Sequence, residues 1–259
     1  MPTAASAFDA AAERYDSDFT LTTIGARMRS AVRSRCAMRF APGSRVLEMN
    51  CGTGEDALWM ADLGVDVLAT DSSPAMLEIA RDKLTAHPRR ASIRFQPLAW
   101  QELSSLDEAL FDGALSNFGG LNCIMDLRAA ACALATKLRP GAVAALCIMG
   151  PVVPWEWLWF LAHGDVQRAF RRLRRGGVVW SGIKIHYPSV AATRKAFSPE
   201  FKVLRVSAIG ALLPPPYAEK SIGRFPRVIA ALDRVERSLE SRWPLPMLAD
   251  HYLIELTRT

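Results

Sequence analysis

The sequence lacks a paired cysteine motif. Its five cysteines are odd in number and none belongs to a Cys-x-x-Cys pair, so neither a disulfide framework nor a metal site is predicted. No apolar run is long enough to span a bilayer. The N-terminal stretch MPTAASAFDAAAERYD has no basic region followed by an apolar one, so no secretory signal is expected. A cytoplasmic protein without a bound metal is the resulting expectation.

The chain also lacks internal repeats, and its net charge of +6 is unevenly spread. Arginines gather at 168–175 and more loosely at 33–39, but neither group is interleaved with aromatic residues as a base-stacking surface would be. Nucleic acid is therefore not the expected partner. The Arg168–Arg175 segment is interpreted first as a solvated face, with an anionic substrate group or a peripheral membrane contact as alternatives.

The most informative pattern that is present is a glycine-rich turn between an apolar strand and a helix. Arg45–Met49 predicts a buried strand that carries Glu48, and Glu55–Leu63 has apolar residues at helical spacing. Between them, Asn50 to Gly54 forms a tight turn. Glycine suits such a turn because it allows positive φ and a close approach of a ligand to the backbone. The stretch predicts a crevice for a nucleotide-type cofactor.

A second strand, Val65–Asp71, also ends in an acid. In open α/β sheets ligands lie beyond the carboxyl ends of strands, where an acid binds ribose hydroxyls. Asp71 follows Gly54 at roughly the expected 20 residues. Ser72-Ser73-Pro74 then predicts the capped start of a helix that carries Met76.

These stretches resemble three motifs of the class I S-adenosylmethionine (SAM) dependent methyltransferases. Glu48-Met-Asn-Cys-Gly-Thr-Gly54 resembles the first, E/D-x-G-x-G-x-G, with Asn50 in place of a glycine; Asn tolerates the left-handed conformation. Asp71 to Met76 resembles the second, and Leu138-Arg-Pro-Gly141 before an apolar strand resembles the third. The resemblance covers about residues 45–150. It implies SAM as cofactor and S-adenosylhomocysteine as product.

The resemblance also implies roles for single residues. Asp71 would hold the ribose, Met76 would border the adenine, and Tyr15-Asp16 is similar to the Tyr-Asp of a helical lid over the cofactor. Leu98 stands where most relatives have an Asp for the adenine amino group, so that role is expected to fall to the Ala99 backbone and Gln101. The predicted cofactor residues are Tyr15, Glu48, Asn50, Gly52, Gly54, Asp71, Ser72, Met76, Ala99, Trp100 and Asn117.

The implied fold is α/β: a Rossmann-like, seven-stranded, mostly parallel sheet with an antiparallel last strand and an inserted helical cap. Its later strands are predicted over Ile93–Leu98, Phe111–Ser116, Ala142–Met149, Phe201–Ile209 and His251–Thr257. The expected parts are a helical lid (1–44), the SAM-binding core (45–150), a cap insertion (151–187) and the rest of the core (188–259) with a second insertion (211–250). Because strands five and six end on the cofactor side, both insertions should begin there and cover the acceptor. A dimer interface is the alternative, so a monomer or a homodimer is expected.

Aromatic residues near this cap predict a small, apolar or aromatic organic acceptor. The predicted acceptor residues are Phe118, Trp155, Trp157, His163 and Tyr217. The tryptophans have a second interpretation, as the core of the cap itself. Ser116-Asn-Phe-Gly is not the Asn/Asp-Pro-Pro-Tyr/Phe of methyltransferases that act on nucleic acid amines, and Pro214–Tyr217 lies too far downstream to replace it.

The implied reaction is an in-line displacement at the sulfonium methyl, which depends mainly on positioning. A general base is needed only if the acceptor must lose a proton. The predicted catalytic residues are His251, Tyr187 and His186, with Asp250 as a possible partner of His251. Two other functions remain open: an RNA methyltransferase that uses Arg168–Arg175, and a SAM-binding partner protein without methyl transfer.

Overall fold

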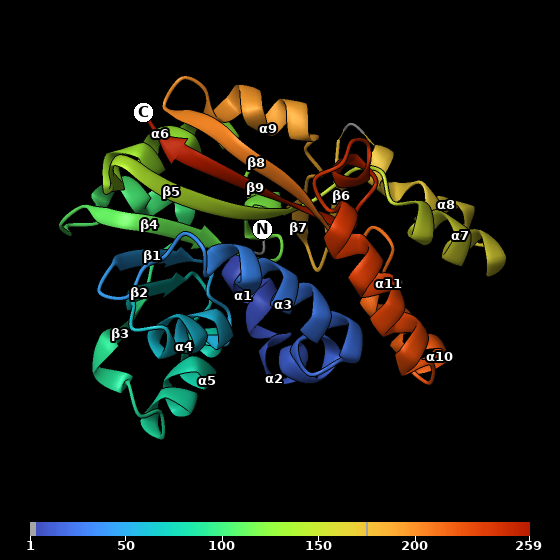
Figure 1. Ribbon diagram of the computed structural model, residues 1–259, viewed down its shortest axis with the longest axis horizontal. Coiled ribbons are helices and arrows are strands. Elements are labelled where there is room, and N and C mark those ends of the chain that lie inside the picture. Colours follow the sequence, from blue (N-terminus) through green and yellow to red (C-terminus); the bar gives the residue numbers. More distant parts are fainter. Residues whose placement is uncertain (1–3, 175) are drawn as a thin grey trace.

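The protein is built on one seven-stranded sheet, seen in a computed structural model that describes residues 4–174 and 176–259 (Figure 1). The strand order is β3-β2-β1-β4-β5-β9-β8. These strands are β1 (Arg45–Met49), β2 (Asp66–Asp71), β3 (Ile93–Pro97), β4 (Phe111–Ser116), β5 (Leu138–Met149), β8 (Phe201–Ile209) and β9 (His251–Arg258). β9 is antiparallel to both β5 and β8, and the other neighbours are parallel. The predicted fold class is confirmed.

Helices cover both faces of this sheet, so strand side chains alternate between two apolar cores. In β1, Leu47 and Met49 join one core and Val46 joins the other. The first core is closed by α6 (Leu127–Lys137) and α9 (Val190–Phe197). The second is closed by α3 (Thr23–Cys36), α4 (Glu55–Asp62) and α5 (Pro74–Thr85). Burial on both faces explains why the central strands read as nearly continuous apolar runs.

The N-terminal segment, which belongs to the helical lid predicted over 1–44, is helical but broken. It consists of α1 (Ala4–Asp9), α2 (Ala12–Tyr15), a π-helical turn (η1, Asp16–Thr20) and α3. Asp9 Oδ1 accepts hydrogen bonds from Ser73 Oγ at 2.5 Å and the Ala75 amide at 3.2 Å. Asp16 accepts from Thr53 Oγ1 at 2.7 Å and from Lys83 Nζ at 2.5 Å. These bonds fasten the segment over the carboxyl ends of β1 and β2.

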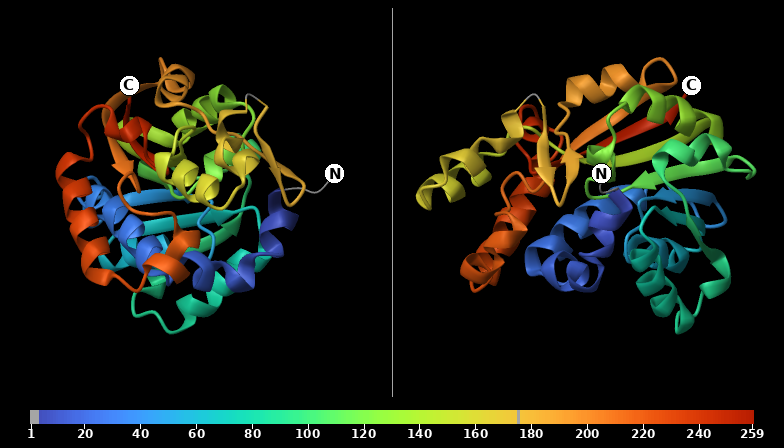
Figure 2. Two further views of the ribbon diagram at one scale, coloured as in Figure 1. Left: turned by 90° about the vertical axis from the view of Figure 1, so that its right-hand side faces the viewer. Right: turned by 180° about the vertical axis from the view of Figure 1, so that it is seen from behind.

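Two long segments follow β5 and β8 and lie beyond the same end of the sheet (Figure 2). The first contains α7 (Pro154–Ala162), α8 (Val166–Ala169), a 3₁₀ turn (η5, Arg171–Leu173) and the hairpin of β6 (Val178–Trp180) and β7 (Ile183–Ile185). The sequence pattern did not predict this hairpin. The second contains η6 (Pro216–Ala218), α10 (Glu219–Ile222), α11 (Pro226–Leu239) and η7 (Leu245–Met247).

Short 3₁₀ turns complete the chain: η2 (Arg90–Ser92), η3 (Trp100–Ser105) and η4 (Gly120–Cys123). The last two lie directly after β3 and β4, at the edge where the predicted cofactor crevice lies. Within 4–174 and 176–259, no helix has the length and apolarity needed to cross a bilayer.

Candidate functional site

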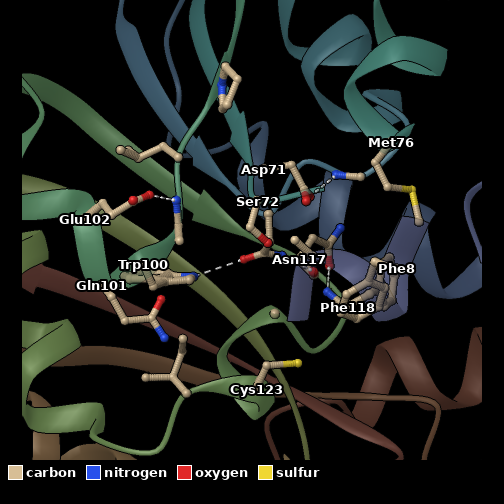
Figure 3. A pocket seen from close by; sticks show the side chains of 18 of the residues that line it. Phe8, Asp71, Ser72, Met76, Trp100, Gln101, Glu102, Asn117, Phe118 and Cys123 are labelled. Atoms are coloured by element: carbon tan, nitrogen blue, oxygen red, sulfur yellow. Dashed lines mark hydrogen bonds between the residues drawn. The ribbon is translucent and has the colours of Figure 1, made fainter. Parts of the chain in front are cut away.

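A cavity of about 710 Å³ lies beyond the carboxyl ends of β1 to β4, a volume typical of cofactor pockets (Figure 3). Its walls come from α1, α2, the glycine-rich turn, β2, η3 and the turn after β4. Nine predicted cofactor residues line it: Tyr15, Asn50, Gly52, Asp71, Ser72, Met76, Ala99, Trp100 and Asn117. Residues far apart in the sequence therefore meet around one space.

The glycine-rich turn has the left-handed backbone expected of it. Asn50, Gly52 and Gly54 have φ values of 51°, 54° and 80°. A Cβ added to Gly52 would lie 3.9 Å from the Tyr15 ring and 4.0 Å from Met76 Sδ, so glycine leaves the space between them open. The absence of a side chain at this position widens the cavity beside the lid.

Asp71 is fixed at the end of β2 by two backbone donors. Its Oδ2 accepts from the Gly52 amide at 2.8 Å and its Oδ1 from the Ser73 amide at 2.9 Å. Burial raises the pKa of Asp71 above its usual range, and these hydrogen bonds act in the opposite direction. The carboxylate retains lone pairs on the cavity side for hydroxyl donors.

Asn50 joins three loops through its side-chain amide. Nδ2 donates to the Asn117 carbonyl at 3.0 Å, and Oδ1 accepts from Ser116 Oγ at 2.7 Å and Trp100 Nε1 at 3.3 Å. A Cβ on Gly120 would overlap this amide, at 2.0 Å from its Cγ. The residue that replaces the motif's first glycine thus holds together the turns after β1, β3 and β4.

We expect Asn50→Gly to destabilise the protein by about 2 kcal/mol, although glycine matches the motif. Glycine accepts the positive φ, but the three hydrogen bonds are lost at about 0.5–1.5 kcal/mol each. Urea unfolding followed by circular dichroism measures the difference. A variant as stable as the wild type would show that the amide adds nothing to the joining of these loops.

Glu48 and Gly54, also predicted to contact the cofactor, do not line the cavity. Glu48 is only 2% exposed, and its Oε2 has no hydrogen-bond partner among the described residues. Burial and the neighbouring Asp56 carboxylate raise the pKa of Glu48 well above its usual value, against the influence of Arg29. Because Glu48 is buried and does not line the cavity, its contact with the cofactor stays a prediction.

We expect the stability of the wild type to fall as the pH rises from about 5 towards 8. A carboxyl with a raised pKa binds its proton more tightly in the folded state, so deprotonation favours unfolding. Glu48→Gln, which cannot ionise, should unfold at a higher temperature than the wild type at pH 8. Its stability should also fall less steeply than that of the wild type as the pH rises. Thermal unfolding between pH 5 and 8 measures both, and parallel curves for the two proteins would contradict the expectation.

The adenine edge differs from the expectation for Ala99. Its amide donates to Glu102 Oε2 at 2.9 Å, and its carbonyl accepts from the Glu102 amide at 3.0 Å. The Ala99 backbone is thus already occupied by the turn of η3, although the residue lines the cavity. Gln101 also lines it and has an exposed side chain, so of the two expected groups Gln101 is the better placed to meet a base.

A second cavity, of about 670 Å³, adjoins the first and shares Phe8, Phe118 and Cys123 with it. Met149 at the end of β5, Trp180 of β6 and neighbouring apolar side chains form its walls. Phe118, a predicted acceptor residue, has a φ of 47°, which is rare for a residue with a large side chain and costs about 1–3 kcal/mol. Such strain often occurs at functional sites. It places the Phe118 ring between the two cavities.

The predicted catalytic residues separate in the structure. Tyr187 lines the second cavity, and burial raises the pKa of its hydroxyl. His251 lies behind Phe118, with ring centroids 5.4 Å apart, and lines neither cavity. Its Nδ1 is 3.0 Å from Asp250 Oδ2, without hydrogen-bond alignment. His186 also lines neither cavity; its backbone pairs with Asn122. The two histidines are therefore not at the walls where a base would act.

Four predicted acceptor residues lie elsewhere, because they form the cap's own packing. Trp155 Nε1 donates to the Leu212 carbonyl at 2.9 Å, and Trp157 packs on Phe170. Tyr217 packs on Phe160, and His163 Nδ1 is 2.7 Å from the Trp159 carbonyl. None of the four lines either cavity. The second interpretation of the tryptophans fits this arrangement, and the prediction that they contact the acceptor is not supported.

The sequence interpretation missed several wall residues. Phe8 of α1 packs on Trp180 with ring centroids 5.4 Å apart, which joins the N-terminal segment to the unpredicted hairpin. Cys123 and Met149 could have been predicted as wall residues, because ligands lie beyond the carboxyl ends of strands. Cys123 follows the fourth strand by a few residues, and Met149 is the last residue of β5. Trp180 could not have been predicted, because its position depends on the hairpin.

The sheet order and the buried Asp71 at the end of β2 are typical of α/β proteins that bind nucleotide-type ligands. Residues 46–141 match the family model described as a methyltransferase domain. A demethylmenaquinone methyltransferase from Clavibacter sepedonicus is 30% identical over 148 residues, which cover 57% of this chain and 58% of that protein. Another from Mycobacterium sp. strain KMS is 33% identical over 144 residues, covering 55% and 58%. The chain thus spans less than two thirds of the length of these relatives.

Solved structures show the same fold. The CcbJ methyltransferase from Streptomyces caelestis has a TM-score of 0.63 at 17% identity, with 98% of both chains covered. A SAM-dependent methyltransferase from Mesorhizobium loti has a TM-score of 0.59 at 21% identity, covering 90% of this chain and 99% of that one. Residues 46–141 are therefore similar to the methyltransferase domain of these relatives, and the relatives and structural neighbours that are named SAM-dependent methyltransferases imply SAM as the cofactor.

Proposed function

We propose that this protein transfers a methyl group from SAM to a small, largely apolar organic acceptor. The observation that carries the proposal is the pair of adjoining cavities. One holds Asp71 and the glycine-rich turn, and the other is walled by apolar side chains; Phe118 and Cys123 stand where they meet. Relatives named as demethylmenaquinone methyltransferases support an organic acceptor with apolar character.

The described residues fit the cofactor. When bound, SAM supplies an electrophilic methyl group on a sulfonium. The Asp71 carboxylate is placed to accept from ribose hydroxyls, and Met76 and Leu98 offer an apolar border for a base. Tyr15 lines the cavity next to Gly52, where it would limit the access of water to a bound cofactor.

The chain's part in the transfer is mainly positioning. Phe118 is held in its unusual backbone conformation by the Asn117 side chain, whose Oδ1 accepts from the Phe118 amide at 3.0 Å. Asn117 Nδ2 in turn donates to buried Asp56 at 2.8 Å. Tyr187 is the predicted catalytic residue on a cavity wall, and its hydroxyl, like that of any protonated tyrosine, can donate a hydrogen bond; burial raises its pKa and so disfavours its ionised form. Alignment of acceptor and methyl group accounts for most of the rate.

The RNA alternative is less favoured, because several arginines of the two basic groups form internal ion pairs. Arg172 is 7% exposed and pairs with Asp250 and Glu156, and Arg171 pairs with Glu156. In the looser group, Arg33 pairs with Asp56, and Arg35 and Arg39 pair with Glu255. These arginines are thus engaged in internal ion pairs and less available to a phosphate backbone, while Arg168 and Arg174 stay exposed.

The test is methyl transfer by the full chain. The protein would be incubated with SAM carrying a labelled methyl group and a panel of phenols, hydroquinones and naphthols, with product and S-adenosylhomocysteine quantified together. We expect equal amounts of both from at least one acceptor. Tight SAM binding without methyl transfer to any acceptor, including RNA, would instead support the non-catalytic SAM-binding interpretation.

A further inference from the structure

The second cavity carries charge of one sign. Three arginines reach its walls, Arg168 from α8, Arg171 from η5 and Arg174 just beyond, and no Asp or Glu among the described residues lines it. The first cavity is the reverse, with Asp71 and Glu102 on its walls and no described Lys or Arg. The walls of the two adjoining cavities therefore carry charges of opposite sign.

The three arginines are not equally compensated. Arg171 pairs with Glu156, and Arg168 lies 3.3 Å from Asp165 with a side chain that is 67% exposed. Arg174 is exposed and makes no side-chain hydrogen bond or ion pair with any residue in the described parts of the chain. Its guanidinium, beside two further cations, is free to meet an anion.

The other walls of this cavity are apolar and lead towards the first cavity. Phe118 and Met149 lie at the strand ends, and Val178, Trp180 and Ile185 come from the hairpin. A solvated charged face would not be combined with such walls. An arginine fork beside an apolar pocket instead matches a molecule with a carboxylate or phosphate at one end and a ring or chain at the other.

We propose that the methyl acceptor is an amphipathic anion, whose carboxylate or phosphate meets Arg174 with Arg168 and Arg171 while its apolar body extends past Trp180 to Phe118. This rests on the proposed function and adds the charge of the substrate to it. The anionic end anchors the molecule at the far end of the cavity. The atom to be methylated then lies at the apolar end, next to the first cavity.

The test uses the full chain saturated with S-adenosylhomocysteine and three probes with one ring system: 2-naphthoate, 2-naphthyl phosphate and 2-naphthamide. Calorimetric titration should show at least one anion binding ten times or more tightly than the neutral amide. The anion that binds more tightly shows whether the arginines prefer a carboxylate or a phosphate. Raising the salt from 50 to 300 mM should weaken the anions and leave the amide unchanged.

Variants separate the charge from the ring. Arg174→Gln should weaken the preferred anion about tenfold and leave the amide unchanged. Trp180→Ala should weaken anion and amide alike. Arg90→Gln, an exposed arginine before β3 at the other end of the sheet, removes the same charge and should change nothing.

The outcomes distinguish the two proposals. Failure of S-adenosylhomocysteine itself to bind overturns the proposed function. If it binds but amide and anions are equal, or none of the three binds, the anionic acceptor is overturned while the methyltransferase proposal stands. An Arg174→Gln variant that binds the anion as tightly as the wild type does also overturns the proposal of an anionic acceptor.

Discussion

Asp71→Ala should lower the affinity for SAM by about 100-fold or more. The carboxylate is placed to accept from two ribose hydroxyls, and hydrogen bonds to a charged acceptor contribute about 1.5–3 kcal/mol each. It also receives the Gly52 and Ser73 amides at 2.8 and 2.9 Å, so its loss loosens the turn beneath the ligand. Both changes lower the affinity, which calorimetric titration with SAM and with S-adenosylhomocysteine measures.

Two further variants make this result interpretable. Asp71→Asn keeps the size of the side chain and one acceptor oxygen, so it should bind more weakly than the wild type but better than Asp71→Ala. Asp82→Ala removes an exposed carboxylate from α5 and should bind normally. Wild-type affinity in a folded Asp71→Ala protein would mean that the ribose is held elsewhere and that the cofactor cavity has been misassigned.

Arg172→Met should destabilise the protein by about 3–5 kcal/mol, the cost of leaving buried charges without their partner. Arg172 Nη2 lies 2.5 Å from Asp250 Oδ1 and Nε lies 2.5 Å from Glu156 Oε2, and both carboxylates are buried. Nη1 also donates to the Asp250 carbonyl at 3.0 Å. Urea unfolding compares this variant with Arg168→Met, whose exposed pair with Asp165 should contribute about 0–1 kcal/mol.

The pH dependence gives an independent check. Burial acts to raise the pKa of Asp250, but Arg172 and His251 hold it well below its usual value. In the wild type this stabilisation is present above about pH 4 and is lost as the pH falls further. Without Arg172 the desolvated carboxyls favour their protonated form, so the difference in free energy of unfolding between variant and wild type should narrow from pH 8 to pH 5. A difference that does not change with pH would exclude an electrostatic origin of the stabilisation by Arg172.

Arg172 also connects stability to the second cavity. Its guanidinium lies over the Tyr187 ring, 5.1 Å from the centroid, and its partner Asp250 directly precedes β9. The ion-paired group of Glu156, Arg172 and Asp250 thus fastens the segment after β5 to the start of the last strand. Residues that seemed on sequence grounds to form a basic surface instead include the central cation of a buried network.

Several strands of the sheet and the turn after the first strand could be predicted from the sequence. Strand bounds at Arg45–Met49, Phe111–Ser116 and Phe201–Ile209 agree with the prediction, because short apolar runs between turn signals leave few alternatives. The left-handed backbone at Asn50 also follows from local chemistry. The turn and Asp71 are close in sequence, so their meeting at one edge follows from the parallel order of β1 and β2.

The arrangement of the residues around the second cavity could not be predicted from the sequence. Arg172 is buried because Glu156 and Asp250 pair with it, whereas Arg174 stays exposed. The two carboxylates lie 16 and 78 positions away from Arg172 in the sequence, and only the fold brings them to it. The aromatic residues of α7 look the same in sequence whether they pack on one another or line a pocket. His251 begins β9 and Phe118 lies in the turn after β4, and the contact between their rings places the histidine behind the wall. Such contacts arise from packing between distant segments, which local periodicity and spacing do not encode.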